Sequence, residues 1–314
     1  MYKHIRVDIN DCLKVKDESD IPGNFTSVIG EFKLPKSNKT AFYKKDGCML
    51  AANNDESIRE LLASEILDIL EVPHAEITLA YDSNNQSTGC LSHSILKEDE
   101  SFINNEFCVT PITDIESYVD REMQNIGRFQ NVTADMINNR KRTVVNQIYI
   151  NCLLNNCDIK PDNMQLIFNN KNGQIRSSEC YDFGLAFSDE NSFIYNKTYE
   201  SMMQELYSKY YDEIKDLSEC VKQRLTPEKL NEFLSETVYQ EGFKGKLSDI
   251  INKLNDRVQL SNKYLDKTNS LNNNQTLSTE VIRQKCSDVS VSLKNSVSNF
   301  INNLLSRDKE GKEK

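Results

Sequence analysis

Two short segments contain the residues whose types and spacing could do chemistry. The first spans residues 156–163 and places Asp158 five residues before Asn163. The second spans residues 181–184, reads Tyr-Asp-Phe-Gly and contains Asp182. Carboxylate and amide oxygens are the ligands that Mg²⁺ prefers in proteins, so Asn163 and Asp182 are candidate metal ligands.

The chemistry that suits this set of residues is the transfer of a phosphoryl group. The transition state carries diffuse negative charge, which Mg²⁺ and nearby cations stabilise. We expect Asp158 to orient the accepting hydroxyl group and take up its proton, and Lys160 to reach the transferred group as a point charge. The two motifs specify about seven residue identities. The chance that all of them match from a given starting position is on the order of one in 10⁹, so two unrelated turns are a poor explanation.

A predicted hairpin would bring the two segments together. Residues 164–168 and 174–181 combine apolar and polar side chains and are predicted to be two strands on either side of an Asn-Gly turn at 172–173. In this arrangement Asn163 opens the first strand and Asp182 closes the second. Because a hairpin returns the chain to its starting point, we expect Asn163 and Asp182 to converge on one metal ion.

The first 100 residues are predicted to form a small β-rich lobe with one helix. An Asp-Gly pair at 46–47 separates two strand-like segments, 40–43 and 48–52, which predicts a hairpin. Apolar residues recur at helical spacing over 56–70 and predict the helix. Two further strands are expected at 75–80 and 89–96.

The rest of the chain is predicted to be mainly helical. Residues 101–268 should form a helical lobe that holds the two motifs and their hairpin. The expected helices lie at 118–126, at 134–155 and beyond residue 199. An Asn-rich linker at 269–278 then leads to a final segment, 279–314, with an amphipathic helix and a polar tail. This order predicts an α+β fold of two lobes, with residues 1–100 as the β-rich lobe.

The two motifs resemble those of the HipA-type kinases, which are bacterial, toxin-like protein serine/threonine kinases. The matching residues are Asp158 and Asn163 in the first motif and Tyr181 and Asp182 in the second. Residues 60–73 also resemble the helix of that family's N-terminal lobe, and the likeness covers roughly residues 40–190. The resemblance implies a two-lobed protein-kinase fold, ATP and Mg²⁺ as cofactors, and a Ser or Thr hydroxyl group of a protein as the acceptor.

The resemblance also implies a lysine near the nucleotide phosphates, paired with a glutamate of the N-lobe helix. Glu60 is the first choice for this glutamate and Glu65 the second. The predicted hairpin makes Lys44 the end of the second strand and puts the lysine position of the third strand at Ala51 or Ala52. Either an alanine stands where the lysine is expected, or Lys44 does its work. The strand order favours the first interpretation slightly.

The sequence departs from the family pattern in three places. Residues 160–162 (Lys-Pro-Asp) follow the catalytic loop of eukaryotic protein kinases instead. Residues 156–157 replace the His-Arg pair that often precedes the catalytic aspartate, so an activation-loop phosphate loses its usual partner. No Gly-x-Gly-x-x-Gly motif is present, and Gly30, within residues 27–33, is the candidate for a turn over the phosphates.

Composition narrows the classes of function. The formal net charge of −10 repels a phosphate backbone, so we expect no nucleic-acid partner. Nine cysteines without a C-x-x-C pair, and only three histidines, give a zinc site no support. No apolar stretch could span a membrane, and the N-terminus lacks the pattern of a signal peptide. We therefore expect a cytoplasmic protein, which the resemblance implies is bacterial, with export as an effector left open.

Two other functions stay open from the sequence. One is a small-molecule or lipid kinase, because distant relatives of the fold phosphorylate such acceptors. The other is a nucleotide-binding pseudokinase that acts as an interaction module, which a missing lysine would favour. The expected partners are a protein substrate and an antitoxin or another regulatory protein.

Overall fold

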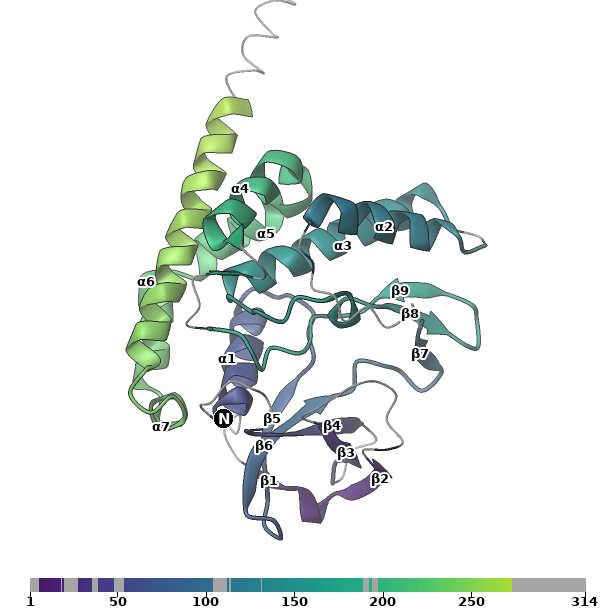
Figure 1. Ribbon diagram of the computed structural model, residues 1–314, viewed down its shortest axis with the longest axis vertical. Helices are drawn as coiled ribbons and strands as arrows, with labels where there is room; N and C mark the ends of the chain where they lie inside the picture. Colours follow the sequence, from purple (N-terminus) through teal and green to yellow (C-terminus); the bar gives the residue numbers. More distant parts are fainter. Residues whose placement is uncertain are drawn as a thin grey trace, which may run out of the picture. The chain divides into compact units, whose positions relative to one another are not determined.

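The computed structural model describes most of the chain (Figure 1). The described residues are 6–17, 19, 28–35, 39–47, 54–103, 112, 114–130, 132–188, 192–193 and 197–272. The chain divides into two compact units, Met1–Leu265 and Asp266–Lys314. Within the described residues, no helix is both long enough and apolar enough to cross a membrane.

A six-stranded sheet forms the N-terminal lobe, with the strand order β1-β5-β6-β4-β3-β2 (Figure 1). All neighbours are antiparallel except β1, which runs parallel to β5. The strands are β1 (Val7–Asp8), β2 (Leu13–Asp17), β3 (Val28–Lys33), β4 (Thr40–Lys45), β5 (Ile77–Asp82) and β6 (Ser87–His93), with a 3₁₀ turn, η1 (Ile9–Asp11), after β1. The two strands predicted at 75–80 and 89–96 are therefore present as β5 and β6.

Strand β4 lies inside the sheet, and this position corrects one prediction. Its residues pair with β3 along one edge and with β6 along the other. Because both edges are occupied, the hairpin predicted between residues 40–43 and 48–52 is wrong. Residues 48–52 themselves lie outside the described residues. The strand order that pointed to Ala51 therefore does not hold.

Helix α1 (Glu56–Ile69) confirms the helix predicted at 56–70. Its residues from Glu56 to Leu67 are all buried, because the helix packs against β5 and β6 and also contacts the C-terminal lobe. The helix ends where Glu71 adopts a left-handed φ of 55°, two residues before Pro73. Both lobes thus meet on one helix.

The C-terminal lobe is mainly helical, as predicted. Its helices are α2 (Ile115–Gly127), α3 (Ala134–Leu153), α4 (Tyr199–Lys209), α5 (Tyr211–Arg224), α6 (Pro227–Glu232) and α7 (Thr237–Gly242), with a 3₁₀ turn, η4 (Phe233–Ser235), before α7. A further helix runs over residues 247–272. Residues 269–272, which were expected to open a linker, are helical, and the helix expected within 279–314 lies outside the described residues.

Four helices of this lobe begin at residues whose side chains cap them. Asp114, Thr133, Thr198 and Thr226 each accept a hydrogen bond from a backbone N–H of the first turn of α2, α3, α4 and α6. Such caps satisfy N–H groups that have no partner inside the helix. The apolar side of α3, with Val144, Val145 and others, then lies at the centre of the core that joins both lobes.

The predicted hairpin of the C-terminal lobe is present, although shorter than expected. Its strands are β8 (Leu166–Asn169) and β9 (Ile175–Ser177), and β7 (Glu100–Phe102) pairs with β8 to complete a three-stranded sheet. Gly173 has the left-handed φ of 72° that the turn requires. A small two-stranded sheet follows, formed by β10 (Ser192–Phe193) and β11 (Lys197–Thr198).

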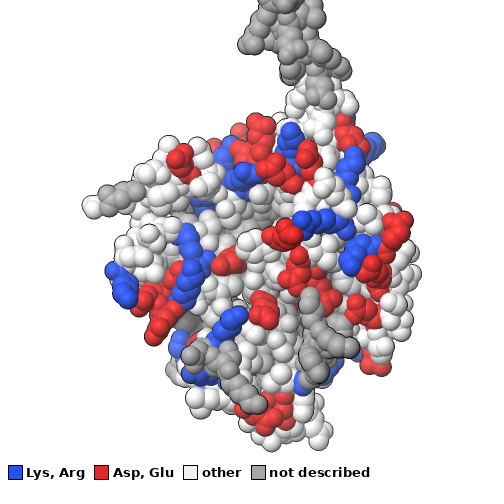
Figure 2. All heavy atoms as spheres, turned by 180° about the vertical axis from the view of Figure 1, so that it is seen from behind, with Lys and Arg blue, Asp and Glu red and all other residues white. Residues whose placement is uncertain are grey.

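Ion pairs between neighbouring helices cover part of the surface. Lys141 pairs with Glu213 and Arg142 with Asp216, and both pairs join α3 to α5. Figure 2 shows acidic and basic side chains interspersed over the face that it draws. Exposed pairs of this kind contribute only about 0–1 kcal/mol each, so the core and not the surface holds the lobe together.

Candidate active site

The first motif forms a loop between α3 and β8. Its backbone makes a 3₁₀ turn, η3 (Pro161–Asn163), in which the proline ring fixes the φ angle of the first position. Asn163 is buried, and its Nδ2 donates to the backbone oxygen of Asp158 at 3.0 Å. The loop is therefore closed on itself, with Asp158 and Asn163 at its two ends. The helix predicted at 134–155 is α3, which ends at Leu153, five residues before Asp158.

Asp158 and Lys160 form an ion pair within this loop. Lys160 Nζ lies 2.7 Å from Asp158 Oδ2, and both side chains are about one-quarter exposed. Burial and the nearby charge of Asp182 raise the pKa of Asp158 above its ordinary value, although Lys160 opposes this effect. A carboxylate with a raised pKa binds a proton more readily, which suits an acceptor of a hydroxyl proton.

The second motif brings Asp182 to the same place. Asp182 follows the end of β9 at Ser177 by five residues, so it does not close the strand as predicted. Its φ is 68°, an uncommon left-handed conformation for a residue that is not glycine. Such backbone strain costs on the order of 1–3 kcal/mol and persists only where the surroundings hold it, typically at functional sites.

The two motifs share hydrogen bonds. The side-chain amide of Asn163 favours the ionised forms of both Asp158 and Asp182, although burial and the charge of Asp182 outweigh this effect at Asp158, whose pKa is raised. Tyr181 also donates a hydrogen bond from its hydroxyl group to the backbone oxygen of Asp162. The structure thus brings Asp158, Asn163 and Asp182 together, as the motifs suggested, although by loops at the ends of the hairpin and not by its strands.

Asn156 is a central residue of the site that sequence reasoning noted only as a replacement. It is fully buried. Its Nδ2 donates to the backbone oxygen of Asp182 at 3.1 Å and to Asn151 Oδ1 at 2.8 Å, and its Oδ1 accepts from the backbone N–H of Asp158 at 3.2 Å. One side chain therefore positions both aspartates. The signal in the sequence was a polar residue two positions before Asp158. That this residue is buried, and not a solvated amide, is seen in the structure.

Lys44 connects the sheet to the second motif. Its Nζ lies 2.5 Å from Glu60 Oε1 on α1 and 2.8 Å from Asp182 Oδ1. Glu60 is 2% exposed, and Lys44 lies beside it as a cationic partner in the interior. Burial opposes the charged form of Lys44, but Asp182 and Glu60 outweigh it and raise its pKa. Burial likewise opposes ionisation of Asp182, and Lys44 and Lys160 together lower its pKa.

One other candidate from the sequence, Gly30, does not join this group. Gly30 lies inside β3, paired with Tyr43, and not in a turn over phosphates. A Cβ atom at Gly30 would lie 2.9 Å from the backbone oxygen of Lys16, so the glycine allows β2 and β3 to approach closely. Ala51 lies outside the described residues.

Arg59 is a second residue that sequence reasoning missed. It is buried, and its Nε pairs with Asp55 Oδ1 at 2.8 Å. Its Nη1 donates to the backbone oxygen of Ala186 at 2.5 Å. Arg59, the residue before Glu60, therefore joins helix α1 to the segment that follows Asp182. The four-residue spacing of Asp55 and Arg59 was the visible signal, but that spacing is common on helix surfaces.

The side chains at this site are better suited to hold Mg²⁺ together with a nucleotide than to hold a metal ion by protein ligands alone. Asp158, Asn163 and Asp182 offer only oxygen ligands, which Mg²⁺ prefers. In the described part of the chain, no group of three or more His, Cys, Asp or Glu side chains could hold a metal by itself. Mg²⁺ is typically held by one or two carboxylates together with substrate phosphates, so the residues fit this pattern.

Comparison with known proteins supports the fold. No protein-family model matches the chain, and no curated protein sequence matches it. The structure is similar to the crystal structure of the Helicobacter pylori proinflammatory kinase CtkA, with a TM-score of 0.57 and 12% identity over 85% of this chain and 99% of that chain. A Shewanella oneidensis MR-1 HipA structure, solved with HipB and operator DNA, matches with a TM-score of 0.44 and 13% identity over 76% of this chain and 62% of that one. The likeness to CtkA shows that this chain has the two-lobed, kinase-like α+β fold that its two motifs predicted.

Proposed function

We propose that this protein transfers the γ-phosphoryl group of ATP to a Ser or Thr hydroxyl group of a protein. The observation that supports this most directly is the position of Lys44, which contacts Glu60 on α1 and Asp182 of the second motif at once. A lysine held by a helix glutamate beside a metal-binding aspartate is the arrangement that nucleotide phosphates require in protein kinases.

The nucleotide half of the site follows from these contacts. Lys44 places its ammonium group where it can bind the α- and β-phosphates, and Glu60 holds it in that position. Asn163 and Asp182 would hold Mg²⁺ through their amide and carboxylate oxygens. When bound, Mg²⁺-ATP supplies the phosphoryl group and neutralises the charge that develops as it moves.

The acceptor half depends on the first motif. Asp158 orients the incoming hydroxyl group and accepts its proton at the carboxylate. Lys160, 2.7 Å from Asp158, stabilises negative charge on the transferred group and keeps the carboxylate in place. Asn156 sets the spacing between this loop and Asp182 through its hydrogen bonds to both.

The pseudokinase alternative loses its main support in this structure. It depended on an alanine at the lysine position, which came from the hairpin that β4 does not form. The small-molecule or lipid kinase shares the same phosphoryl-transfer residues, so it differs from our proposal only in the acceptor. The assay below therefore has to identify the acceptor.

The test is transfer of label from γ-³²P-ATP with Mg²⁺ to proteins of a heat-treated bacterial lysate. We expect labelled protein that yields phosphoserine or phosphothreonine on hydrolysis. Asp158→Asn and Lys44→Met should abolish the label, whereas Lys45→Met, a neighbouring lysine of β4, should keep it. Label in lipid or a small metabolite would support the other kinase class, and ATP binding without any transfer would contradict our proposal.

A further inference from the structure

The turn after β4 caps helix α1 from outside the helix. Asp55, the residue that precedes α1, makes no capping hydrogen bond with its side chain. Asp46 takes this role instead: its Oδ1 accepts from the backbone N–H of Ser57 at 2.8 Å, and its Oδ2 accepts from the Ser57 hydroxyl group at 2.9 Å. A helix usually obtains this cap from the residue just before it, whereas Asp46 and Ser57 are 11 residues apart in the chain. The first turn of α1 is thus satisfied by a different element of the fold.

The carboxylate of Asp55 is occupied by another contact. It accepts from Arg59 Nε at 2.8 Å and from Arg59 Nη2 at 3.2 Å, and both side chains are buried. Arg59 in turn donates to the backbone oxygen of Ala186, in the segment after the second motif. The beginning of α1 is therefore held on two sides, by Arg59 toward the second motif and by Asp46 toward β4.

Further hydrogen bonds tie the same turn to its surroundings. Asp46 Oδ2 accepts from Thr88 Oγ1 on β6 at 2.7 Å, and the N–H of Asp46 donates to the backbone oxygen of Thr88 at 2.9 Å. The N–H of Gly47 donates to Glu56 Oε2, in the first turn of α1, at 3.0 Å. Hydrogen bonds to an ionised carboxylate are roughly twice as strong as those between neutral groups, and the helix dipole favours negative charge at this end. The Asp-Gly pair that suggested a hairpin in the sequence thus connects α1 to two neighbouring strands.

This cap lies beside the lysine–glutamate pair of the candidate active site. Lys44 lies two residues before Asp46, and Glu60 lies three residues after Ser57, a spacing that puts Ser57 and Glu60 on one side of α1. One small cavity is lined by all four residues and by Asp182. Two links therefore join β4 to α1 at this point: the ion pair of Lys44 with Glu60, and the hydrogen bonds of Asp46 with Ser57.

The two links differ in stiffness. Lys44 reaches Glu60 through a flexible four-carbon side chain, so their ion pair can form over a range of separations between the two backbones. Asp46 has a short side chain and binds a backbone N–H, so its contact fixes the separation of the backbones themselves. Binding groups at an active site have to be held to within about 0.5 Å, and neighbouring residues that support them supply this precision. The cap therefore adds a positional constraint that the ion pair by itself lacks.

We propose that Asp46 is a positioning residue for the nucleotide phosphates. By capping α1 from the end of β4, it fixes the distance between the two elements and so holds the ammonium group of Lys44 where the α- and β-phosphates bind. This inference rests on the proposed function, which assigns Lys44 to those phosphates. Asp46 acts through Lys44 and needs no contact with the nucleotide, because both of its carboxylate oxygens already accept hydrogen bonds.

The test is the affinity of the full-length protein for adenosine 5′-(β,γ-imido)triphosphate with Mg²⁺, measured by calorimetry, which requires no phosphoryl transfer. We expect Asp46→Ala to weaken binding about tenfold, because a small displacement of Lys44 from the phosphates costs affinity. Ser57→Ala removes only the hydroxyl donor and keeps the backbone hydrogen bond to Asp46, so it should weaken binding by a smaller factor. If Asp46→Ala does not fold, unchanged affinity in Ser57→Ala would contradict the proposal.

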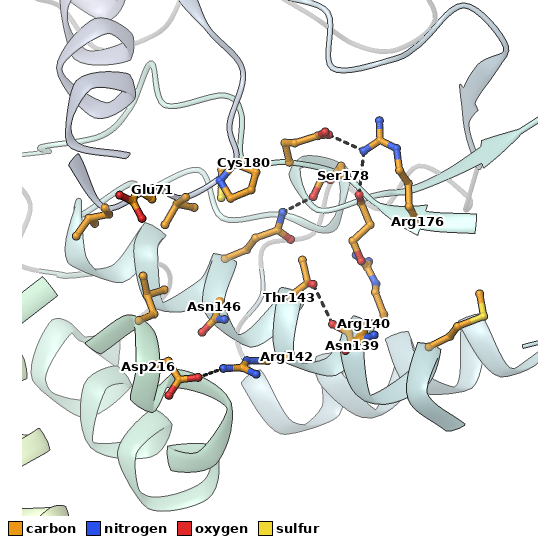
Figure 3. A pocket seen from close by; sticks show the side chains of 18 of the residues that line it. Glu71, Asn139, Arg140, Arg142, Thr143, Asn146, Arg176, Ser178, Cys180 and Asp216 are labelled. Carbon is orange, nitrogen blue, oxygen red and sulfur yellow. Dashed lines mark hydrogen bonds and ion pairs between the residues drawn. The ribbon is translucent and has the colours of Figure 1, made fainter. Parts of the chain in front are cut away.

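Two control variants separate positioning from a general loss of stability. Thr226→Ala removes the cap of α6, a hydrogen bond from the Lys229 N–H at 3.3 Å, and Thr226 does not line the cavity beside Lys44. Asp216→Ala removes a carboxylate that pairs with Arg142 in a different pocket, on the side of the C-terminal lobe (Figure 3). Both controls should keep the affinity of the wild-type protein. If Asp46→Ala and Thr226→Ala have equal affinities, whether unchanged or reduced, the proposal is overturned.

Urea unfolding gives a second readout that needs no nucleotide. The variants are Asp46→Ala, Lys44→Met and the two changes combined. Because both residues join β4 to α1, their effects on the unfolding equilibrium constant should differ from a simple product by at least about twofold, and independent effects would contradict the role of Asp46. A wild-type protein that does not bind the nucleotide would overturn the proposed function and this role together. Wild-type binding with an unaffected Asp46→Ala variant would overturn only the role of Asp46.

Discussion

Lys44 and Asp182 form an ion pair at 2.8 Å although 138 residues separate them in the chain. Lys44 comes from the interior strand of the N-terminal sheet, and Asp182 comes from the loop after β9. Glu60 completes the group from α1. The candidate active site is thus assembled from residues of both lobes, so its geometry depends on how the two lobes pack together.

Replacing Lys44 should affect both stability and activity. Lys44→Met leaves Glu60 buried without its partner, and we expect a loss of about 3–5 kcal/mol in the free energy of unfolding. Adding Glu60→Gln removes one of the two carboxylates that lose Lys44 as a partner, the other being Asp182, and should restore part of this stability but none of the activity. Urea denaturation together with label transfer measures both. Full activity in Lys44→Met would show that another residue binds the phosphates.

Replacing Asp158 should act on the chemical step. Asp158→Asn keeps the size of the side chain but cannot accept the hydroxyl proton, so kcat should fall by roughly 10²–10⁴-fold. The KM for ATP should change little, because Asp158 contacts neither Lys44 nor Glu60. Steady-state kinetics on an identified substrate checks this. A large rise in KM with kcat unchanged would place Asp158 in nucleotide binding instead.

The raised pKa of Asp158 predicts a pH dependence. Burial and the charge of Asp182 raise this pKa, so the carboxylate becomes protonated at a higher pH than an exposed aspartate does. As pH falls through that value, kcat/KM should decrease, and the Asp158→Asn variant should lack this acid limb. The sign for stability is opposite, because a folded state that binds the proton more tightly gains stability on protonation. Asp158→Asn should therefore be slightly more stable than wild type at pH 7.

Asn156 should prove essential as a positioning residue. Asn156→Leu has a similar size but loses the hydrogen bonds to Asp158, Asp182 and Asn151, and we expect a loss of roughly 2–4 kcal/mol in unfolding free energy. Its kcat should fall far more than the affinity for Mg²⁺-ATP, measured by calorimetry below its unfolding temperature. An equal loss of kcat in Leu153→Ala, a variant of a buried apolar residue at the end of α3, would indicate a purely structural role.

Local patterns in the sequence were sufficient for much of the fold. The periodicity over 56–70 predicted α1, and the Asn-Gly turn at 172–173 predicted the hairpin of β8 and β9. Both are determined by neighbours in the chain, since helical periodicity and turn residues act over a few positions. The two motifs predicted the kinase-like fold for the same reason. Each motif lies within one short loop, so its residue types can be recognised from neighbouring positions in the chain. The roles of Asp158, Asn163 and Asp182 stay predictions until activity is measured.

Only the tertiary structure decided which lysine meets Glu60. The Asp-Gly pair at 46–47 indicates a hairpin locally, but β3 and β6 occupy both edges of β4, and β6 comes more than 40 residues later. Strand pairing is settled by distant partners, so no local pattern could reveal it. Asn156 and Arg59 were missed for the same reason: their partners, Asp182 and Ala186, lie far along the chain. The sequence by itself determined the residues that could do the chemistry, and the packing of the two lobes decided which of them meet.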